Sequence, residues 1–398
     1  MSATSGNDCS RGPAGLYVAL ELGLKEWKMA STVGLGQKPR IRTLPARGLA
    51  ALWRELATAK QRFGLSPEAA VFSCYEAGRD GFWLDRVLRE RGVQNVVVDS
   101  SSIEVNRRKR RAKTDRLDAQ KLVTMLLRYH WGEAKLWSVL RIPSLEEEDQ
   151  RHLHRELLAV KGERTRHINR IKGLLISVGI ALPTVDTSFP EDLERLRLWW
   201  ASRAGTAPPL PAALRERCRR EYERLALAER QIRDLEEARL AQIGSSSSPA
   251  METVRQLMKL RGIGPAISWL LTMECLAWRK FANRRELASM AGLTPTPYSS
   301  SQGEREQGIS KAGNRRLRTM LVELAWGWLV FQPESALSRW YAERFGSGSQ
   351  RQRKIGIVAL ARKLWVALWR YVETGEVPEG AVVGDWEEKV PRRLRTAA

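Results

Sequence analysis

The segment Leu16-Tyr-Val-Ala-Leu-Glu-Leu22 is a short apolar run broken by one acid, which is typical of a strand in the middle of a sheet. Helical patterns and strand-like runs alternate after it, at 48–62, Ala70–Tyr75, 81–91 and Asn95–Val98. This alternation predicts an α/β domain in which helices cross between the strands of one sheet. We place the domain at residues 14–135 and expect its chemistry at the ends of the strands.

The rest of the chain has a helical pattern. Apolar residues recur at helical spacing through 145–243, on both sides of a proline-rich break, which predicts an antiparallel coiled-coil connector. The stretch Gly244–Pro249 has the composition of a flexible linker, and we expect a mainly helical second domain over 251–345. A basic, tryptophan-containing helix is expected at 351–375, ending before Gly375 and Pro378.

The charge of the chain favours a polyanionic partner. Lysine and arginine outnumber aspartate and glutamate by 67 to 45 in 398 residues, which gives a formal net charge of +22 and a pI near 10.4. Nucleic acid is the natural partner for such a chain. No apolar run approaches the roughly 20 residues of a membrane-spanning helix, and residues 1–15 lack the apolar core of a signal peptide. We therefore expect no membrane partner and a cytoplasmic, nucleoid-associated protein.

Cysteine and histidine give no metal or disulfide pattern. The four cysteines lie far apart without paired spacing, which argues against a disulfide framework or a zinc finger. His152 and His154 are two residues apart and do not share a helical face, so we expect both to be surface residues rather than metal ligands.

Four carboxylates are candidates for chemistry: Glu21 in the first strand, Glu76 after a later one, and Asp115 and Asp118 opening a helix. The two aspartates are three residues apart, hence neighbours on one helical face. Two Mg²⁺ ions need shared oxygen ligands of this kind to cut a phosphodiester, and Mn²⁺ is an alternative ion. Against this, acids in a first helical turn are stabilised by the helix dipole, Thr114 could simply cap the helix, and Glu76 could be an ordinary strand-end acid. Glu21 is harder to explain, because an acid in an apolar strand is costly to bury unless it is paired or binds metal.

A basic run directly precedes Asp115. Such a run is usually a solvated loop or helix face, but beside acids that repel DNA phosphates a cationic flank can hold the strand. We predict phosphate contacts from the six cations of this run: Arg107, Arg108, Lys109, Arg110, Arg111 and Lys113.

Two stretches in the second domain also carry candidates. Leu260–Ala266 resembles a helix-hairpin-helix turn whose amides approach a phosphate, although a glycine turn between packed helices is an equal alternative. Thr294–Gly303 has the composition of a polar loop, and it leads toward a basic helix over Gly308–Arg318. Loop serines are usually only solvated, and no histidine base stands nearby. Further nucleic-acid contacts are predicted here, from Lys311, Asn314, Arg315 and Arg316.

Several motifs, in their order along the chain, resemble those of the insertion-sequence transposases with a DEDD acidic site, also described as bridge-RNA-guided recombinases. The resemblance covers nearly the whole chain. Its carriers are the strand around Glu21, Tyr75-Glu-Ala-Gly78, Lys113-Thr-Asp-Arg-Leu-Asp-Ala119, Gly262-Ile-Gly-Pro265, Leu293-Thr-Pro295 and Gly308-Ile-Ser-Lys-Ala-Gly-Asn314. It implies a RuvC-like (RNase H-like) N-terminal domain, a coiled-coil connector and a C-terminal transposase domain, in agreement with the boundaries given above.

The resemblance assigns the acidic positions. Glu76, Asp115 and Asp118 take the second, third and fourth of them, and Glu21 stands where an aspartate is usual at the first. Glutamate can still ligate magnesium, but its oxygen is displaced by about one carbon–carbon bond.

The resemblance also implies a serine in the second domain that attacks DNA and forms a covalent phosphoserine link. Ser300 matches it best by its distance from Gly308. The usual pattern is serine followed by glycine, whereas Ser299, Ser300 and Ser301 here precede Gln302, so the choice among three serines is open.

The expected function is excision and insertion of a mobile element by strand cleavage and rejoining. Element-end and target DNA, a structured guide RNA and a homodimer or homotetramer are the partners that the resemblance implies, in a prokaryotic cell. Two alternatives stay open: a junction-resolving nuclease that hydrolyses without rejoining, and a catalytically inactive nucleic-acid-binding protein, which the glutamate at position 21 suggests.

Overall fold

A computed structural model describes residues 14–78, 81–99, 102–103, 115–133, 136–181, 185, 210–300 and 303–395, with the backbone alone at 297–300 and 303–307. The chain divides into two compact units, residues 1–143 and 144–398. Each unit is described here by itself.

The first unit is built on a five-stranded sheet in the order β3-β2-β1-β4-β5. Its strands are β1 (Leu16–Leu22), β2 (Glu26–Thr32), β3 (Arg40–Pro45), β4 (Val71–Glu76) and β5 (Gln94–Val98). β1, β4 and β5 run parallel, whereas β2 and β3 are antiparallel additions on the other side of β1. The predicted α/β class is confirmed, and the three predicted strands are β1, β4 and β5. The sequence analysis missed β2 and β3, because polar residues such as Glu26, Lys28 and Arg42 leave neither strand with a continuous apolar run.

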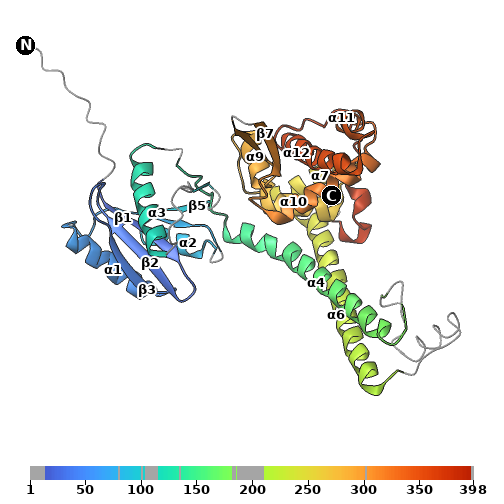
Figure 1. The fold of residues 1–398 in the computed structure, drawn as a ribbon, viewed down its shortest axis with the longest axis horizontal. Helices are drawn as coiled ribbons and strands as arrows, with labels where there is room; N and C mark the ends of the chain where they lie inside the picture. Colours follow the sequence, from blue (N-terminus) through green and yellow to red (C-terminus); the bar gives the residue numbers. More distant parts are fainter. Residues whose placement is uncertain are drawn as a thin grey trace, which may run out of the picture. The chain divides into compact units, whose positions relative to one another are not determined.

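Helices cover both faces of this sheet (Figure 1). α1 (Leu49–Arg62) and α2 (Trp83–Glu90) share a core with Leu16, Val18 and Leu20 of β1. α3 (Asp115–His130) packs on the opposite face, against Tyr17 and Ala19. Because β1 is buried on both faces, all of its first five residues are apolar, which is the pattern that reveals it in the sequence.

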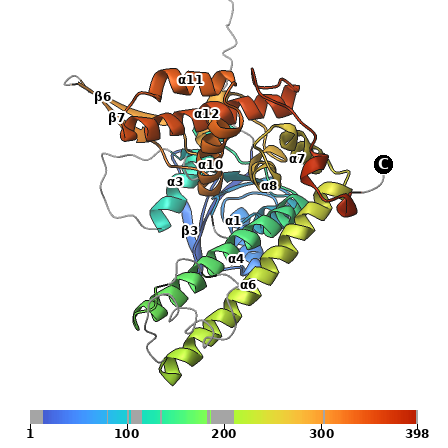
Figure 2. The same cartoon turned by 90° about the vertical axis from the view of Figure 1, so that its right-hand side faces the viewer.

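Two long helices begin the second unit. α4 (Leu145–Ile176) starts at Ser144, whose side chain and that of Glu147 form a capping box. α6 (Ala212–Ser245) packs along α4, and Figure 2 shows the two helices side by side. An ion pair joins Lys161 to Glu236 and a hydrogen bond joins His167 to Glu221, each at 2.6 Å. As the α4 partner advances along the chain the α6 partner recedes, so the helices are antiparallel. No helix among the described residues is long and apolar enough to cross a membrane.

The segment predicted as a flexible linker, Gly244–Pro249, is a packed helix junction. α6 continues to Ser245, and α7 (Pro249–Lys259) begins after Ser248, whose side chain accepts from the Met251 amide. Arg255 donates to the carbonyls of Ile243 (2.9 Å) and Ser246. The linker prediction was wrong because Arg255 on the following helix satisfies the junction's carbonyls, a contact that the composition of the segment does not reveal.

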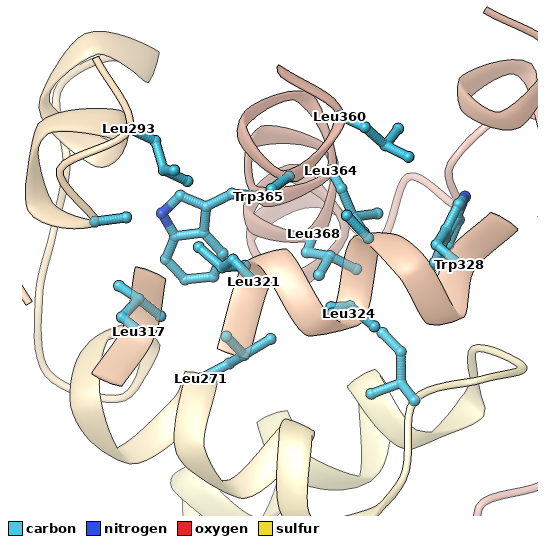
Figure 3. Close-up of a cluster of buried hydrophobic side chains, with 14 of the residues drawn as sticks. Leu271, Leu293, Leu317, Leu321, Leu324, Trp328, Leu360, Leu364, Trp365 and Leu368 are labelled. Carbon is cyan, nitrogen blue, oxygen red and sulfur yellow. The ribbon is translucent and has the colours of Figure 1, made fainter. Parts of the chain in front are cut away.

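The main core of the second unit contains residues from these described helices: α7, α8 (Pro265–Leu271), the π-helical turn η2 (Thr272–Leu276), α9 (Arg284–Met290), α10 (Arg315–Phe331), α11 (Ala336–Phe345) and α12 (Gln350–Thr374). Figure 3 shows leucines of α10 and α12 meeting around Trp365 and Trp328. Trp365 donates to the Leu287 carbonyl at 3.1 Å. The helix predicted at 351–375 is α12, and it ends as expected at Gly375, which adopts a left-handed conformation with φ 77°.

The stretch predicted as a polar loop is a two-stranded hairpin. β6 (Pro295–Ser300) pairs antiparallel with β7 (Gly303–Ile309), with an irregularity between Pro295 and Pro297. Figure 2 shows the hairpin extending from the helices of its unit. The loop interpretation was wrong because both strands are polar and β6 contains two prolines, features that hide a strand from a search for apolar alternation.

Candidate functional site

Glu21 and Glu76 occupy equivalent positions at the end of two neighbouring parallel strands. Leu20 of β1 is the register partner of Tyr75 of β4, so the next residue on each strand is one of the two glutamates. Residues in register on adjacent strands point to the same face. That face is the one covered by α3, because it also carries Ala19 and Cys74.

The start of α3 lies at the same edge of the sheet. Near the beginning of the strands, the rings of Tyr17 and Phe72 contact His130, the last residue of α3, at 5.6 and 4.6 Å between centroids. Further along β4, the Cys74 thiol lies 3.8 Å from the Leu122 carbonyl. The helix therefore runs antiparallel to β1 and β4. Its first turn, with Asp115 and Asp118, points back to the strand ends that bear Glu21 and Glu76.

The four carboxylates are of the right chemical class for magnesium, which takes oxygen ligands. Glu76 and Asp115 are exposed, whereas Glu21 and Asp118 are half-buried. Within the described parts of the chain, however, no three His, Cys, Asp or Glu side chains are placed so that they could hold a metal ion. The acids thus share one edge of the sheet without forming a closed ligand set.

A lysine lies beside this edge. Lys28 of β2 is the register partner of Glu21 on the opposite side of β1. Its ammonium group donates to Glu26 at 2.6 Å and to the Thr43 hydroxyl at 2.8 Å.

The basic run that was predicted to bind phosphates lies outside the described residues. It comprises Arg107, Arg108, Lys109, Arg110, Arg111 and Lys113.

In the second unit, the segments 290–294 and 310–314 are joined by backbone hydrogen bonds at the base of the hairpin. The Asn314 amide donates to the Met290 carbonyl at 2.7 Å, and the Ser310 amide donates to the Thr294 carbonyl at 2.8 Å. Gly313 has φ 93°, and a side chain there would collide with the Met290 carbonyl. The glycine is therefore required twice over, by its backbone conformation and by close packing.

The candidate serines lie at the far end of this hairpin from its base. Ser299 and Ser300 are the last residues of β6, and Ser300 is the register partner of Gly303. Ser301 and Gln302 fall outside the described residues, as do the side chains of the other two serines. Position along β6 therefore places Ser299 and Ser300 at the end of the strand, and it does not distinguish among the three serines.

The predicted contacts next to the hairpin base fall into two kinds. Lys311, Arg315 and Arg316 are exposed at and before the start of α10. Asn314 is engaged within the protein, because its side-chain oxygen accepts from the amides of Arg316 (2.9 Å) and Leu317 (3.2 Å) and so caps α10.

A buried acid that the sequence analysis did not select, Glu274, connects this region to α4. Only 2 % of its side chain is exposed. The carboxylate accepts from His154 Nε2 (2.8 Å), from Arg155 Nε and a terminal guanidinium nitrogen (2.9 and 3.0 Å), and from Asn314 Nδ2 (2.8 Å). Burial raises the pKa of Glu274, but the hydrogen bonds from His154 and Arg155 and the Arg155 charge outweigh it, and the net pKa is well below the usual range.

This network corrects the prediction for one histidine. His152 is exposed, as expected, but His154 is buried against Glu274. A signal for the network was present in the sequence: Glu274 is the one charged residue in a largely apolar stretch from Ala266 to Leu276, just as Glu21 interrupts β1. A lone acid in an apolar run predicts a buried partner.

The glycine turn between α7 and α8 is packed within the protein. Gly262 has φ 87°, and a β-carbon there would lie 2.8 Å from Phe331. Lys389 donates to the carbonyls of Leu260 and Ile263, both at 3.1 Å. These contacts favour a turn between packed helices, and a phosphate contact at the turn stays a prediction.

Comparison with known proteins identifies the chain. The sequence profile described as Transposase IS116/IS110/IS902 family matches residues 254–339. A putative transposase, y4rJ, from Sinorhizobium fredii is 42% identical over 385 residues, which cover 92% of this chain and 94% of that protein. The chain belongs to the IS116/IS110/IS902 transposase family. A transposase for the insertion sequence element IS1328 from Yersinia enterocolitica is 26% identical over 227 residues, covering 56% of this chain and 63% of that protein.

The profile of this transposase family includes the hairpin, its base and Glu274. These features therefore belong to the part of the transposase that the family profile describes. The carboxylate edge is the edge of the first unit's sheet that bears Glu21 and Glu76, with Asp115 and Asp118 beside it. It lies outside the range that the family profile matches. The alignment with the putative transposase of S. fredii covers 92% of this chain.

Proposed function

We propose that this transposase excises and inserts its element with two sets of groups, the carboxylate edge of the first unit and a serine at the tip of the hairpin. One observation carries the proposal: Glu21 and Glu76 stand in register on one face, and α3 runs back so that Asp115 and Asp118 begin at the same edge. A RuvC-like assignment of this unit is part of the proposal, supported by a mixed sheet with helices on both faces.

Magnesium is the cofactor that fits the chemistry of this edge. Glu21, Glu76, Asp115 and Asp118 would hold it, because all four offer carboxylate oxygens. When bound, such ions activate the attacking oxygen and stabilise the leaving oxygen of a phosphodiester. To bind one ion together, the four carboxylate groups would need to lie closer to one another than in the described structure.

The serine supplies the rejoining step. Its oxygen loses a proton and bonds to phosphorus, while one phosphorus–oxygen bond of the DNA breaks and releases a free hydroxyl. Attack by a second DNA hydroxyl on this phosphoserine restores the diester and frees the serine. We assign Ser300 this role, with Ser299 and Ser301 as alternatives, because all three lie at or beside the hairpin tip.

The proposed partners follow from charge and from the family. The net charge of +22 suits element-end DNA, target DNA and a structured guide RNA together. Exposed Lys311, Arg315 and Arg316 beside the hairpin base are proposed phosphate contacts. We propose a homodimer or homotetramer, in which the two sets of groups come from different subunits, acting on the nucleoid.

An excision assay in cells tests the carboxylate edge. Asp115→Asn and Glu76→Gln each keep the shape and remove the charge, and we expect each to lower excision roughly 100-fold or more. Glu21→Asp, which restores the shorter acid, should retain excision. The matched control is Glu68→Gln, an exposed acid of the same unit, which should excise normally. Normal excision by Asp115→Asn and Glu76→Gln would remove the carboxylate edge from the mechanism.

A second function, binding of nucleic acid without cleavage, is favoured by one observation: no three described acids, histidines or cysteines are placed to hold a metal. It predicts that the wild-type protein binds element-end DNA equally with and without magnesium and never yields an excised product. An excised product from the wild type removes this candidate.

A further inference from the structure

A wide groove lies beside the hairpin base in the second unit. Its volume is ≈ 1270 Å³, and it is bordered by one face of α12, by α11, by the start of α9 and by the segment 376–379. Pro295 and Gly308, at opposite sides of the hairpin base, and Lys311 also line it. The groove therefore reaches the structural support of the candidate serines, which gives it a functional context.

The rim of the groove is strongly cationic. Seven of its lining residues are basic and two are acidic: Arg284, Lys311, Arg351, Lys354, Arg362, Lys363 and Arg370 against Glu376 and Glu379. Five of the basic residues lie on α12 alone. From Arg351 to Arg370 the helix extends about 28 Å at roughly 1.5 Å per residue, so the positive charge forms a row and not a point.

The charge of this row is uncompensated. Where the structure describes side chains, none of the seven cations forms an ion pair with a carboxylate. The Lys363 ammonium lies 4.6 Å from the centre of the Trp340 ring instead. A second hollow of ≈ 420 Å³ shares Arg284 and Arg370 with the groove, so these two arginines border both hollows.

The floor of the groove is apolar. Val358 and Val366 of α12 are half-buried there, and Ile355 is 53% exposed. Leu337 and Trp340 contribute from α11. A DNA duplex presents phosphates on its outside and would leave such a floor uncovered, whereas a single strand can lay its bases on apolar and aromatic side chains while its phosphates meet the rim.

We propose that this groove binds one unpaired DNA strand and leads it to the hairpin. The proposal rests on the proposed function, because strand exchange at the hairpin requires a separated strand near the serines. Two features select the ligand: the row of unpaired cations selects a polyanion, and the apolar floor selects exposed bases over a duplex.

Fluorescence anisotropy with a labelled 20-nucleotide DNA of mixed sequence tests the proposal on the full chain. The double variant Arg362→Gln/Arg370→Gln should reduce the slope of log affinity against log salt by about 1.4, at about 0.7 for each lost phosphate contact, and weaken binding roughly 25-fold at 0.1 M salt. The matched control Arg230→Gln/Arg233→Gln makes the same charge change on exposed residues of α6 and should leave the affinity within about twofold.

The apolar floor has its own variant. Ile355→Glu places a carboxylate in the groove at an exposed site, so folding should be preserved, and single-strand binding should fall at least as far as in the arginine double variant. Val330→Glu, at a residue 72% exposed on α10 and outside the groove, is the control. Duplex of the same sequence should be little affected by Ile355→Glu.

Three results would overturn the proposal: unchanged single-strand affinity in both groove variants, equal loss for duplex and single strand, or tighter binding of an RNA of the same sequence that the groove variants abolish. The last would make RNA the ligand. Each leaves the proposed function standing, because that function is read from excision in cells. If the wild-type protein fails to excise its element but still binds a single strand through the groove, the proposed function is wrong and the groove proposal stands.

Discussion

Replacing Glu274 by glutamine should destabilise the second unit by about 2–3 kcal/mol. The carboxylate receives four hydrogen bonds and is 2 % exposed, while its charged partner Arg155 is 37% exposed. Removing one member of a buried ion pair costs roughly 3–5 kcal/mol, and the partial exposure of Arg155 reduces that figure. Two donors meet each carboxylate oxygen, and glutamine keeps one acceptor oxygen and places a donor at the other position, so two of the four donors lose their acceptor.

The pH dependence of this effect has a definite sign. The folded pKa of Glu274 is lowered, so its contribution to stability is fully present above the unfolded value of about 4.3. As pH falls below that value, the unfolded chain takes up a proton that the folded protein does not, and the contribution shrinks. The difference in unfolding free energy between wild type and Glu274→Gln should thus be constant near pH 6–7 and fall toward zero in acid.

Denaturant unfolding followed by tryptophan fluorescence measures this difference, and thermal unfolding should show a midpoint lowered by roughly 5–10 °C. Glu323→Gln, an exposed acid on α10, is the control and should change stability by less than about 0.5 kcal/mol. A Glu274→Gln protein as stable as wild type at pH 7, or a difference that grows in acid, would refute the assignment of a buried ionised Glu274.

Three further outcomes are expected. Gly313→Ala should destabilise the protein by about 1–3 kcal/mol in thermal unfolding, because φ is 93° and the added methyl group would collide with the Met290 carbonyl. Gly34→Ala is the control and should leave stability unchanged, because the space around Gly34 is open. Equal melting temperatures of the two variants would contradict this expectation. Leu364→Ala, at 0% exposure, should cost about 2–5 kcal/mol of unfolding free energy against almost nothing for Val330→Ala. Cleavage of element-end DNA should stop in EDTA and return with excess Mg²⁺; full activity in EDTA would count against the carboxylate edge.

In the first unit, strands with continuous apolar runs could be predicted from the sequence, and strands without such runs could not. β1, β4 and β5 are buried on both faces and could be predicted from continuous apolar runs, and the edge shared by Glu21 and Glu76 follows once they pair in parallel. β2 and β3 were missed, since Glu26, Lys28 and Arg42 break any such run. The direction of α3, which brings Asp115 to the edge, depends on packing with Tyr17 and Phe72 that no local pattern encodes.

In the second unit, the predictions that failed depend on contacts that the composition of the segment itself does not show. The junction at Gly244–Pro249 is fixed by Arg255, and the partner of His154 is 120 residues away. The hairpin is stabilised at its base by bonds between Thr294 and Ser310, and its prolines concealed it. Motif glycines such as Gly313 could be located from the sequence, but their reason, contact with another backbone segment, required the fold.

The most direct test of the proposed mechanism is a denaturing gel of the protein incubated with magnesium, its flanking noncoding RNA and labelled element-end DNA. The mechanism predicts a protein-linked DNA species that disappears in Ser300→Ala and in Asp115→Asn; if Ser300→Ala retains it, Ser299→Ala and Ser301→Ala identify the nucleophile. Free cleaved ends without any linked species would contradict the mechanism and indicate a nuclease that hydrolyses without rejoining.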